Sequence, residues 1–252
     1  MVNSDFEKYR YNIFSQNGED GIIQELLFRL QEKISKDPWC VEFGAWDGIH
    51  MSNTFNLVKN GWNGLYIEGN SERFKELTKT CEKFSKLLSE CKYVEKDYES
   101  PNSLDNILKS KKIPINFDIL SIDVDSFDLE IWEQLKGFSP KIVIIEINSN
   151  YLPGILKWHT GNKPVNKFGG NSFSATLMVA KNKGYQLICH TGNMIFIKND
   201  YLELLNISKK YIQYPDLLFD DSTYIESKRM NLSIELINFF KKIIKKSKSF
   251  FP

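Results

Sequence analysis

One stretch of eight residues, Val41-Glu42-Phe43-Gly44-Ala45-Trp46-Asp47-Gly48, constrains the fold of this chain more than any other. The run Trp39–Phe43 has the length of a short buried strand, and it is followed by two glycines four positions apart. In open α/β sheets, ligands bind where the carboxyl end of a strand turns into a helix. Glycine at such a turn lets the backbone approach a ligand closely. The stretch therefore predicts an α/β protein with its binding site after the first strand.

The composition is that of a globular domain without a nucleic-acid partner. The chain has 252 residues, of which 42% are hydrophobic and 26% charged, and its formal net charge is +1. Four cysteines form no CxxC pair, and residues 1–11 carry charges without an apolar run, so we expect reduced thiols and a cytoplasmic location. A single domain over 1–252 is the simplest organisation, with a core over about 12–200 and a peripheral helical extension over 201–252.

Seven strands are predicted along the chain, most of them separated by helices. The fifth, within 141–147, carries the apolar run 142–145, which is typical of a strand at the centre of a parallel sheet. The last two are joined by a short link at 191–193, a hairpin signal. Ser15 or Asn17 is expected to cap the first helix, and Ser71 is expected to cap a helix that runs to about Leu88. The predicted strands are 39–43, 65–68, 93–97, 119–123, 141–147, 185–189 and 194–198.

Acidic side chains end several of these strands, at Glu68, Asp97, Asp123 and Glu146. A doubly wound sheet brings such strand ends to one edge. An acid that ends the second strand suits the two ribose hydroxyls of a nucleoside cofactor. Asp47 within the first turn would repel a pyrophosphate but accept hydrogen bonds from a cationic amino-acid group. This pattern favours S-adenosylmethionine (SAM) over a dinucleotide.

Five short motifs together resemble the FkbM-type SAM-dependent methyltransferases. They are SQNGED at 15–20, EFGAWDG at 42–48, IEG at 67–69, SIDVD at 121–125 and HTGN at 190–193. The resemblance covers about residues 12–200. It implies a Rossmann-like seven-stranded sheet of order 3-2-1-4-5-7-6, with strand seven antiparallel and helices on both faces. It also implies O-methylation of a sugar or nucleotide-linked sugar, as in capsule or lipopolysaccharide synthesis.

The same resemblance implies where SAM binds. Gly44 and Asp47 are expected near its methionine part, Glu68 on the ribose and Asp97 near the adenine. We also assign to the cofactor site four further residues: Gln16, Glu42, Ser52 and Asp123.

The reaction needs a group that removes the proton of the acceptor hydroxyl. Asp123, Glu146 and Asn148 form a hard-oxygen set suited to Mg²⁺ or Mn²⁺, which would lower the pKa of that hydroxyl. Alternatively, Asp123 or Asp125 binds substrate hydroxyls directly and no metal is present. His159 is then the first choice for a base or for a contact with the acceptor, whereas His190 has the position of a structural histidine.

Two further segments are expected to contact the acceptor, a second copy of the chain or a membrane. The long loop 149–172, with Tyr151, Trp158, His159 and Asn162, is expected to shape the acceptor site. The lysine-rich segment 231–248 would cover the core or form a homodimer contact, in preference to lying on an anionic membrane. Two other functions stay open on the sequence: a nicotinamide-dependent oxidoreductase and a non-catalytic scaffold that keeps the fold.

Overall fold

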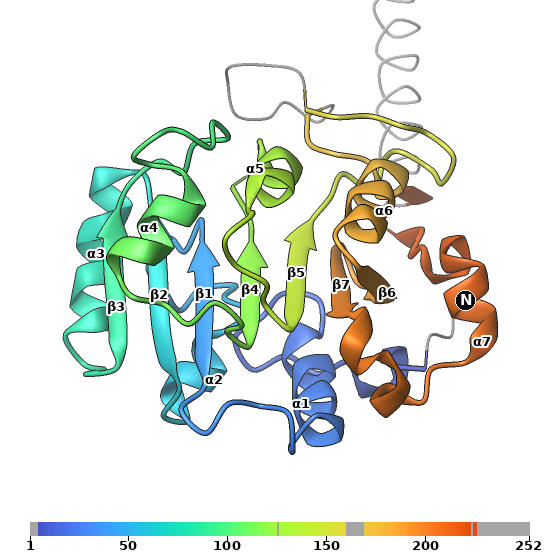
Figure 1. The fold of residues 1–252 in the computed structure, drawn as a ribbon, viewed down its shortest axis with the longest axis horizontal. Coiled ribbons are helices and arrows are strands. Elements are labelled where there is room, and N and C mark those ends of the chain that lie inside the picture. The colour runs from blue at the N-terminus through green and yellow to red at the C-terminus, as the bar shows by residue number, and fades with distance from the viewer. Residues whose placement is uncertain (1–4, 125, 160–168, 223, 226–252) are drawn as a thin grey trace, which may run out of the picture.

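The computed structural model describes residues 5–124, 126–159, 169–222 and 224–225. They form a seven-stranded sheet of order β3-β2-β1-β4-β5-β7-β6 (Figure 1). Strands β1 to β5 pair in parallel, and β7 is antiparallel to both of its neighbours. This is the Rossmann-like methyltransferase sheet that the sequence predicts. The strands are β1 Trp39–Phe43, β2 Asn63–Glu68, β3 Leu87–Cys91, β4 Ile119–Ile122, β5 Ile142–Glu146, β6 Tyr185–His190 and β7 Asn193–Lys198.

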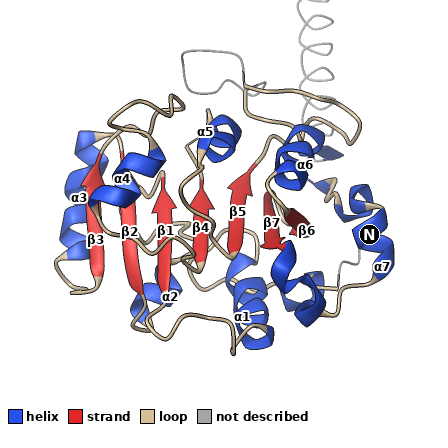
Figure 2. Ribbon diagram, viewed as in Figure 1, coloured by secondary structure: helices blue, strands red, loops and turns tan. Residues whose placement is uncertain are grey.

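Helices cover both faces of the sheet (Figure 2). Apolar side chains of α1, α2 and α3 pack on one face, and those of α4, α5 and α6 pack on the other. The helices are α1 Glu19–Arg29, α2 Phe55–Lys59, α3 Ser71–Cys81, α4 Leu104–Ser110, α5 Asp128–Gln134, α6 Phe173–Asn182 and α7 Lys209–Gln213, with short 3-10 turns η1 Glu7–Tyr9, η2 Asn199–Leu205 and η3 Pro215–Leu218. No helix in the described ranges is long and apolar enough to cross a membrane.

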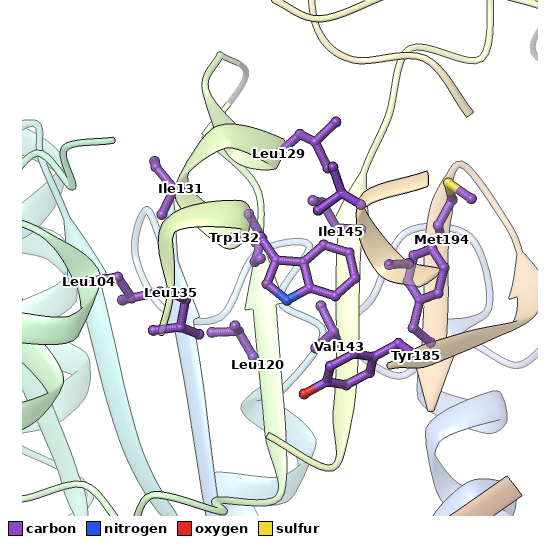
Figure 3. Close-up of a cluster of buried hydrophobic side chains, with 14 of the residues drawn as sticks. Leu104, Leu120, Leu129, Ile131, Trp132, Leu135, Val143, Ile145, Tyr185 and Met194 are labelled. Carbon is purple, nitrogen blue, oxygen red and sulfur yellow. The ribbon is translucent and has the colours of Figure 1, made fainter. Parts of the chain in front are cut away.

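Trp132 of α5 fixes this helix against the sheet (Figure 3). Its fully buried ring lies 5.5 Å from that of Tyr185 and 5.3 Å from that of Phe196, measured between centroids. Leu129 and Leu135 of α5 are buried in the same cluster. Burial of side chains this large contributes about 1.5–3 kcal/mol each, so the first turn of α5 is held firmly at the carboxyl edge of the sheet.

Three local predictions were wrong. The third strand is Leu87–Cys91, not 93–97, so α3 ends at Cys81 and Asp97 does not end a strand. The cap of α3 is Asn70, whose side chain accepts hydrogen bonds from the backbone N–H groups of Glu72 and Arg73. The N-cap residue of α1 is Gly18, which is left-handed, and not Ser15 or Asn17, although the Ser15 hydroxyl accepts the backbone N–H of Asp20 in the first turn at 3.0 Å.

The described part of the segment that follows β7, residues 199–222, packs against the core. Leu205, Leu218 and Phe219 are buried in the two apolar clusters. The guanidinium of Arg10 holds this segment, because it forms an ion pair of 2.6 Å with Asp220 and donates a 2.9 Å hydrogen bond to the carbonyl of His190. The predicted amphipathic helix at 231–248 lies outside the described residues.

Candidate functional site

The chain changes faces between β1 and β4, which are adjacent parallel strands. β1 leads into α2 on one face of the sheet, and β4 leads into α5 on the other. Such a switch point leaves a crevice beyond the strand ends, where ligands of doubly wound proteins bind. Gly44 lies at this point with φ +80°, and a Cβ at this position would collide with the carbonyl oxygen of Asp123. Only glycine lets the two strand ends meet so closely.

Acidic side chains line the switch point because of the sheet register. Continuing the pairs Phe43–Ile67 and Phe43–Ile122 by one residue sets Glu68 and Asp123 on either side of Gly44. Glu146 of β5 follows Asp123 in the same way. Side chains alternate along strands, so Glu68, Asp123 and Glu146 share the face that carries α1, α2 and α3. Because Gly44 has no side chain, no third side chain stands between these two acids.

The first turn is held by its own acids. Glu68, which is 5% exposed, accepts hydrogen bonds from the backbone N–H groups of Trp46 (2.9 Å) and Asn70 (2.7 Å). The Oδ1 atom of Asp47 accepts from the N–H groups of Ile49 and His50, at 2.9 and 2.8 Å. Both carboxylates therefore shape the turn.

Trp46 adopts φ +46°, a strained value for a bulky residue. The guanidinium of Arg73 lies 4.9 Å from its ring, and its indole N–H donates to Glu76. These contacts hold the tryptophan at the rim of the turn.

Glu42 lies beneath the turn in a buried hydrogen-bond network. Its carboxylate accepts from the hydroxyl groups of Ser52 (2.9 Å) and Thr54 and from the backbone N–H of Thr54. The Thr54 hydroxyl also lies 2.8 Å from that of Tyr66. Burial raises the pKa of Glu42 to about 7, against the hydrogen bonds, and the charge of Asp123 adds to the increase. Glu42 and Ser52 are thus held in a buried network beneath the first turn, and a contact of either with the cofactor stays a prediction.

Asn53 is a residue of the site that the sequence argument did not single out. It is 5% exposed, and its Nδ2 donates to Ser121 of β4 at 3.1 Å. Its Oδ1 is buried without a hydrogen-bond partner among the described residues. The only signal in the sequence is the polar run Ser52-Asn53-Thr54 after the turn. An unpaired buried acceptor beside the switch point is a position for a ligand N–H or O–H group.

The motif at 15–20 performs a structural task. Asp20 accepts hydrogen bonds from the backbone N–H groups of residues 13, 14 and 15 at 2.7–2.8 Å. Glu19 is fully buried and accepts from Thr191 and Asn193 in the β6–β7 hairpin. The motif therefore joins α1 to the hairpin. Gln16 is exposed beside it.

Asp97 is exposed in the loop after β3, where its Oδ1 accepts from the N–H of Glu99. A contact with adenine thus remains a prediction that rests on this loop instead of a strand end.

His159 is buried, with 8% exposure, and its backbone N–H donates to Asn171 Oδ1 at 2.8 Å. Its Nδ1 accepts the backbone N–H of Gly170 at 3.2 Å. A neutral imidazole that accepts at Nδ1 carries its proton on Nε2. The geometry thus gives His159 the role of a hydrogen-bond donor and speaks against its use as a base.

His190 has the structural role that its position in the sequence indicated. Its Nδ1 accepts the N–H of Asp220 at 2.8 Å, its Nε2 lies 3.3 Å from the Ser149 hydroxyl, and Phe219 stacks on its ring. Burial lowers its pKa to about 4, so the ring is neutral at physiological pH.

The geometry does not favour the predicted metal set. The described residues contain no group of three or more histidine, cysteine or acidic side chains that would hold a metal ion. The Oδ1 of Asn148 accepts from both the backbone and the side chain of Asn150, each at 3.0 Å, so this oxygen is already engaged. Asp125 and Asn162 lie outside the described residues.

Comparisons with known proteins are distant. No protein-family model matches the chain, and no curated protein gives a significant match. Among solved structures, the N-terminal domain of EvdMO1 with SAH bound is 13% identical over 73% of this chain and 80% of its own, with a TM-score of 0.43. TrmK of M. capricolum, in complex with S-adenosyl-homocysteine, is 16% identical over 89% of this chain and 96% of its own, with a TM-score of 0.44. Monomeric WbdD is 13% identical over 71% of this chain and 40% of its own, with a TM-score of 0.45. Similarities this low carry no argument about function, which depends on the site itself.

Proposed function

We propose that this chain is a SAM-dependent O-methyltransferase that transfers a methyl group to a hydroxyl of a sugar or nucleotide-linked sugar. The observation that carries the proposal is the composition of the switch point. Glu68, Asp123 and Glu146 follow one another along the strand ends, and Asp47 stands in the first turn. The FkbM-type resemblance of the sequence supports the same function.

The fit between this site and SAM is one of charge and hydrogen bonding. The crevice offers carboxylates and the unpaired amide oxygen of Asn53. SAM brings an ammonium, a sulfonium and two ribose hydroxyls, which are the cations and donors that such a surface attracts. A pyrophosphate would meet repulsion at Asp47 and Glu68, so the site disfavours the alternative of a nicotinamide-dependent oxidoreductase. A non-catalytic scaffold that keeps the fold would transfer no methyl group to any acceptor.

The chain's own residues would work as follows. Asp47 and Asn53 bind the ammonium group, and Glu68 accepts from the ribose. Bound SAM supplies an electrophilic methyl group. Asp123, which is exposed at the end of β4 beside Gly44, accepts the proton of the acceptor hydroxyl. Loss of this proton to Asp123 would let the hydroxyl oxygen bond to the methyl carbon, with the C–S bond broken and its electron pair left on the departing cofactor. Orientation at about 3 Å contributes most of the acceleration in such a displacement.

The setting in the cell is also a proposal. The resemblance points to capsule or lipopolysaccharide biosynthesis in the cytoplasm. The lysine-rich segment 231–248 would cover the core or form a homodimer contact, in preference to lying on an anionic membrane.

Thermal unfolding with SAM, S-adenosylhomocysteine (SAH), NAD or buffer, each with and without EDTA, tests the proposal. A ligand at 100 times its dissociation constant stabilises a protein by about 2.7 kcal/mol, or several degrees for a chain of this size. A shift with SAM and SAH alone supports the proposal, and a loss of stability with EDTA would bring the metal set back. If neither adenosyl compound raises the midpoint, the proposal is wrong.

A further inference from the structure

Three buried polar atoms meet at the carboxyl edge on the other face of the sheet, where α5 and α6 lie. They are Glu130 Oε2, His159 Nε2 and Asn171 Nδ2, and none has a hydrogen-bond partner among the described residues. His159 is 8% exposed and Asn171 1% exposed. Buried polar groups are nearly always paired, so three unpaired ones in one place require an explanation.

The three side chains are neighbours that come from two elements. Glu130 lies in the first turn of α5, which Trp132 fixes to the sheet. His159 and Asn171 belong to the loop between β5 and α6 and are joined by the 2.8 Å hydrogen bond from His159 N–H to Asn171 Oδ1. Burial raises the pKa of Glu130, and the neighbouring side chains of His159 and Asn171 oppose part of this increase, which places the three groups close together.

The hydrogen-bonding character of each atom is fixed by its surroundings. His159 Nδ1 accepts from Gly170, so Nε2 is a donor. Asn171 Oδ1 accepts from His159, so the free end of this amide is also a donor. Glu130 supplies an acceptor. Phe127 lines the same place, with its ring 4.9 Å from that of His159, and Lys96 Nζ lies 4.0 Å above it.

We propose that Glu130, His159 and Asn171 bind a pair of adjacent hydroxyl groups of the methyl acceptor. Two fixed donors and one carboxylate complement a vicinal diol, because each hydroxyl both donates and accepts. The half-buried ring of Phe127 offers an apolar surface to the C–H groups of a pyranose. Glu130 is itself half-buried, so the cluster reaches the surface through this side chain. The inference rests on the proposed function and adds an acceptor-binding set that includes neither Asp123 nor Asp47.

The thermal stability of a Glu130 variant distinguishes a ligand-binding role of the cluster from a purely structural one. If the cluster served the fold, Glu130→Met would lose favourable contacts and lower the midpoint of thermal unfolding. If the polar groups are held for a ligand, removing a buried unpaired carboxylate leaves the midpoint unchanged or raises it by about 2–4 °C. Glu133→Met on the same helix, where the side chain is exposed, is the matched control.

Binding is then measured on the full chain saturated with SAH. Methyl α-glucopyranoside, methyl α-galactopyranoside and methyl α-mannopyranoside are titrated while the imidazole resonances of His159 are followed by NMR. We expect a saturable shift with at least one glycoside, an affinity at least tenfold weaker in Glu130→Gln, and no change in Glu133→Gln. A midpoint lowered by several degrees in Glu130→Met, or no His159 shift with any glycoside, would overturn the assignment.

The two proposals fail separately in this design. SAH affinity, measured by calorimetry, should be the same in wild type and Glu130→Gln, because Glu130 lies outside the cofactor crevice. Wild type that does not bind SAH but still shows the His159 shift refutes the cofactor and keeps the diol site. Wild type that binds SAH without the shift refutes the diol site alone.

Discussion

Replacing Glu42 by glutamine should change how the stability of this protein depends on pH. Burial raises the pKa of Glu42 from its ordinary value of 4.5 to about 7. One pKa unit corresponds to about 1.36 kcal/mol, so the shift amounts to about 3 kcal/mol. The folded state binds this proton more tightly than the unfolded state. The contribution to stability is therefore fully present below pH 4.5 and is lost as the pH rises through 7.

Glutamine cannot titrate, and its oxygen can accept the same hydrogen bonds from Ser52 and Thr54. The free energy of unfolding of Glu42→Gln, relative to wild type, should therefore rise by about 3 kcal/mol between pH 4.5 and pH 8. Urea denaturation of both proteins at several pH values measures this difference. The other titrating groups are the same in both proteins, so their contributions cancel in the difference. His190 is one of them: its pKa is lowered to about 4, so it destabilises both proteins equally as the pH falls below 6.5. Parallel curves for the two proteins would refute the argument, and Glu133→Gln serves as the exposed control.

Three further changes follow from the contacts described above. Asp118→Ala should cost about 3–5 kcal/mol in urea denaturation, because it leaves the buried ammonium of Lys141 without its ion-pair partner; a cost below 1 kcal/mol would contradict this. Asp20→Ala should cost about 2–3 kcal/mol, since three backbone N–H groups lose their acceptor; an unchanged unfolding midpoint would show that water replaces it. Gly44→Ala should abolish SAH binding in calorimetry and cost at least about 1–2 kcal/mol for the left-handed backbone alone; retained binding would mean that the crevice lies elsewhere.

The architecture could be predicted because local patterns agree with the fold. The apolar run at 142–145 can only be a buried strand, and the link at 191–193 can only close a hairpin if both flanking runs are strands. The third strand could not be predicted in the same way. It lies at the edge of the sheet, where Leu87 is buried and Leu88 is 38% exposed. In the sequence, these two leucines continue the helical spacing of Leu77 and Cys81, so they are easily assigned to the preceding helix. Pairing with β2, a tertiary effect, decides the outcome.

The acids of the site were identifiable as strand ends, but their roles depend on distant partners. Glu19 is buried because Thr191 and Asn193, more than 170 residues away, donate to it. The tautomer of the His159 ring depends on the backbone N–H of Gly170, which no sequence pattern marks. The placement of Glu68 and Asp123 on either side of Gly44 follows from the register between β1, β2 and β4. Glu130 carries no sequence signal, since it reads as an ordinary polar position of a short helix.

The central claim is that the switch point between β1 and β4 binds an adenosyl cofactor. Calorimetric titration of SAH and of NAD into wild type and Asp47→Asn tests it most directly. Asparagine keeps an oxygen for the N–H groups of Ile49 and His50, so the turn should survive while the charge is lost. Glu72→Gln, on the exposed side of α3, is the control. We predict micromolar binding of SAH at one site in wild type, no binding of NAD, and at least tenfold weaker SAH binding in Asp47→Asn. Binding of NAD but not of SAH, or equal SAH affinity in the two proteins, would contradict the account.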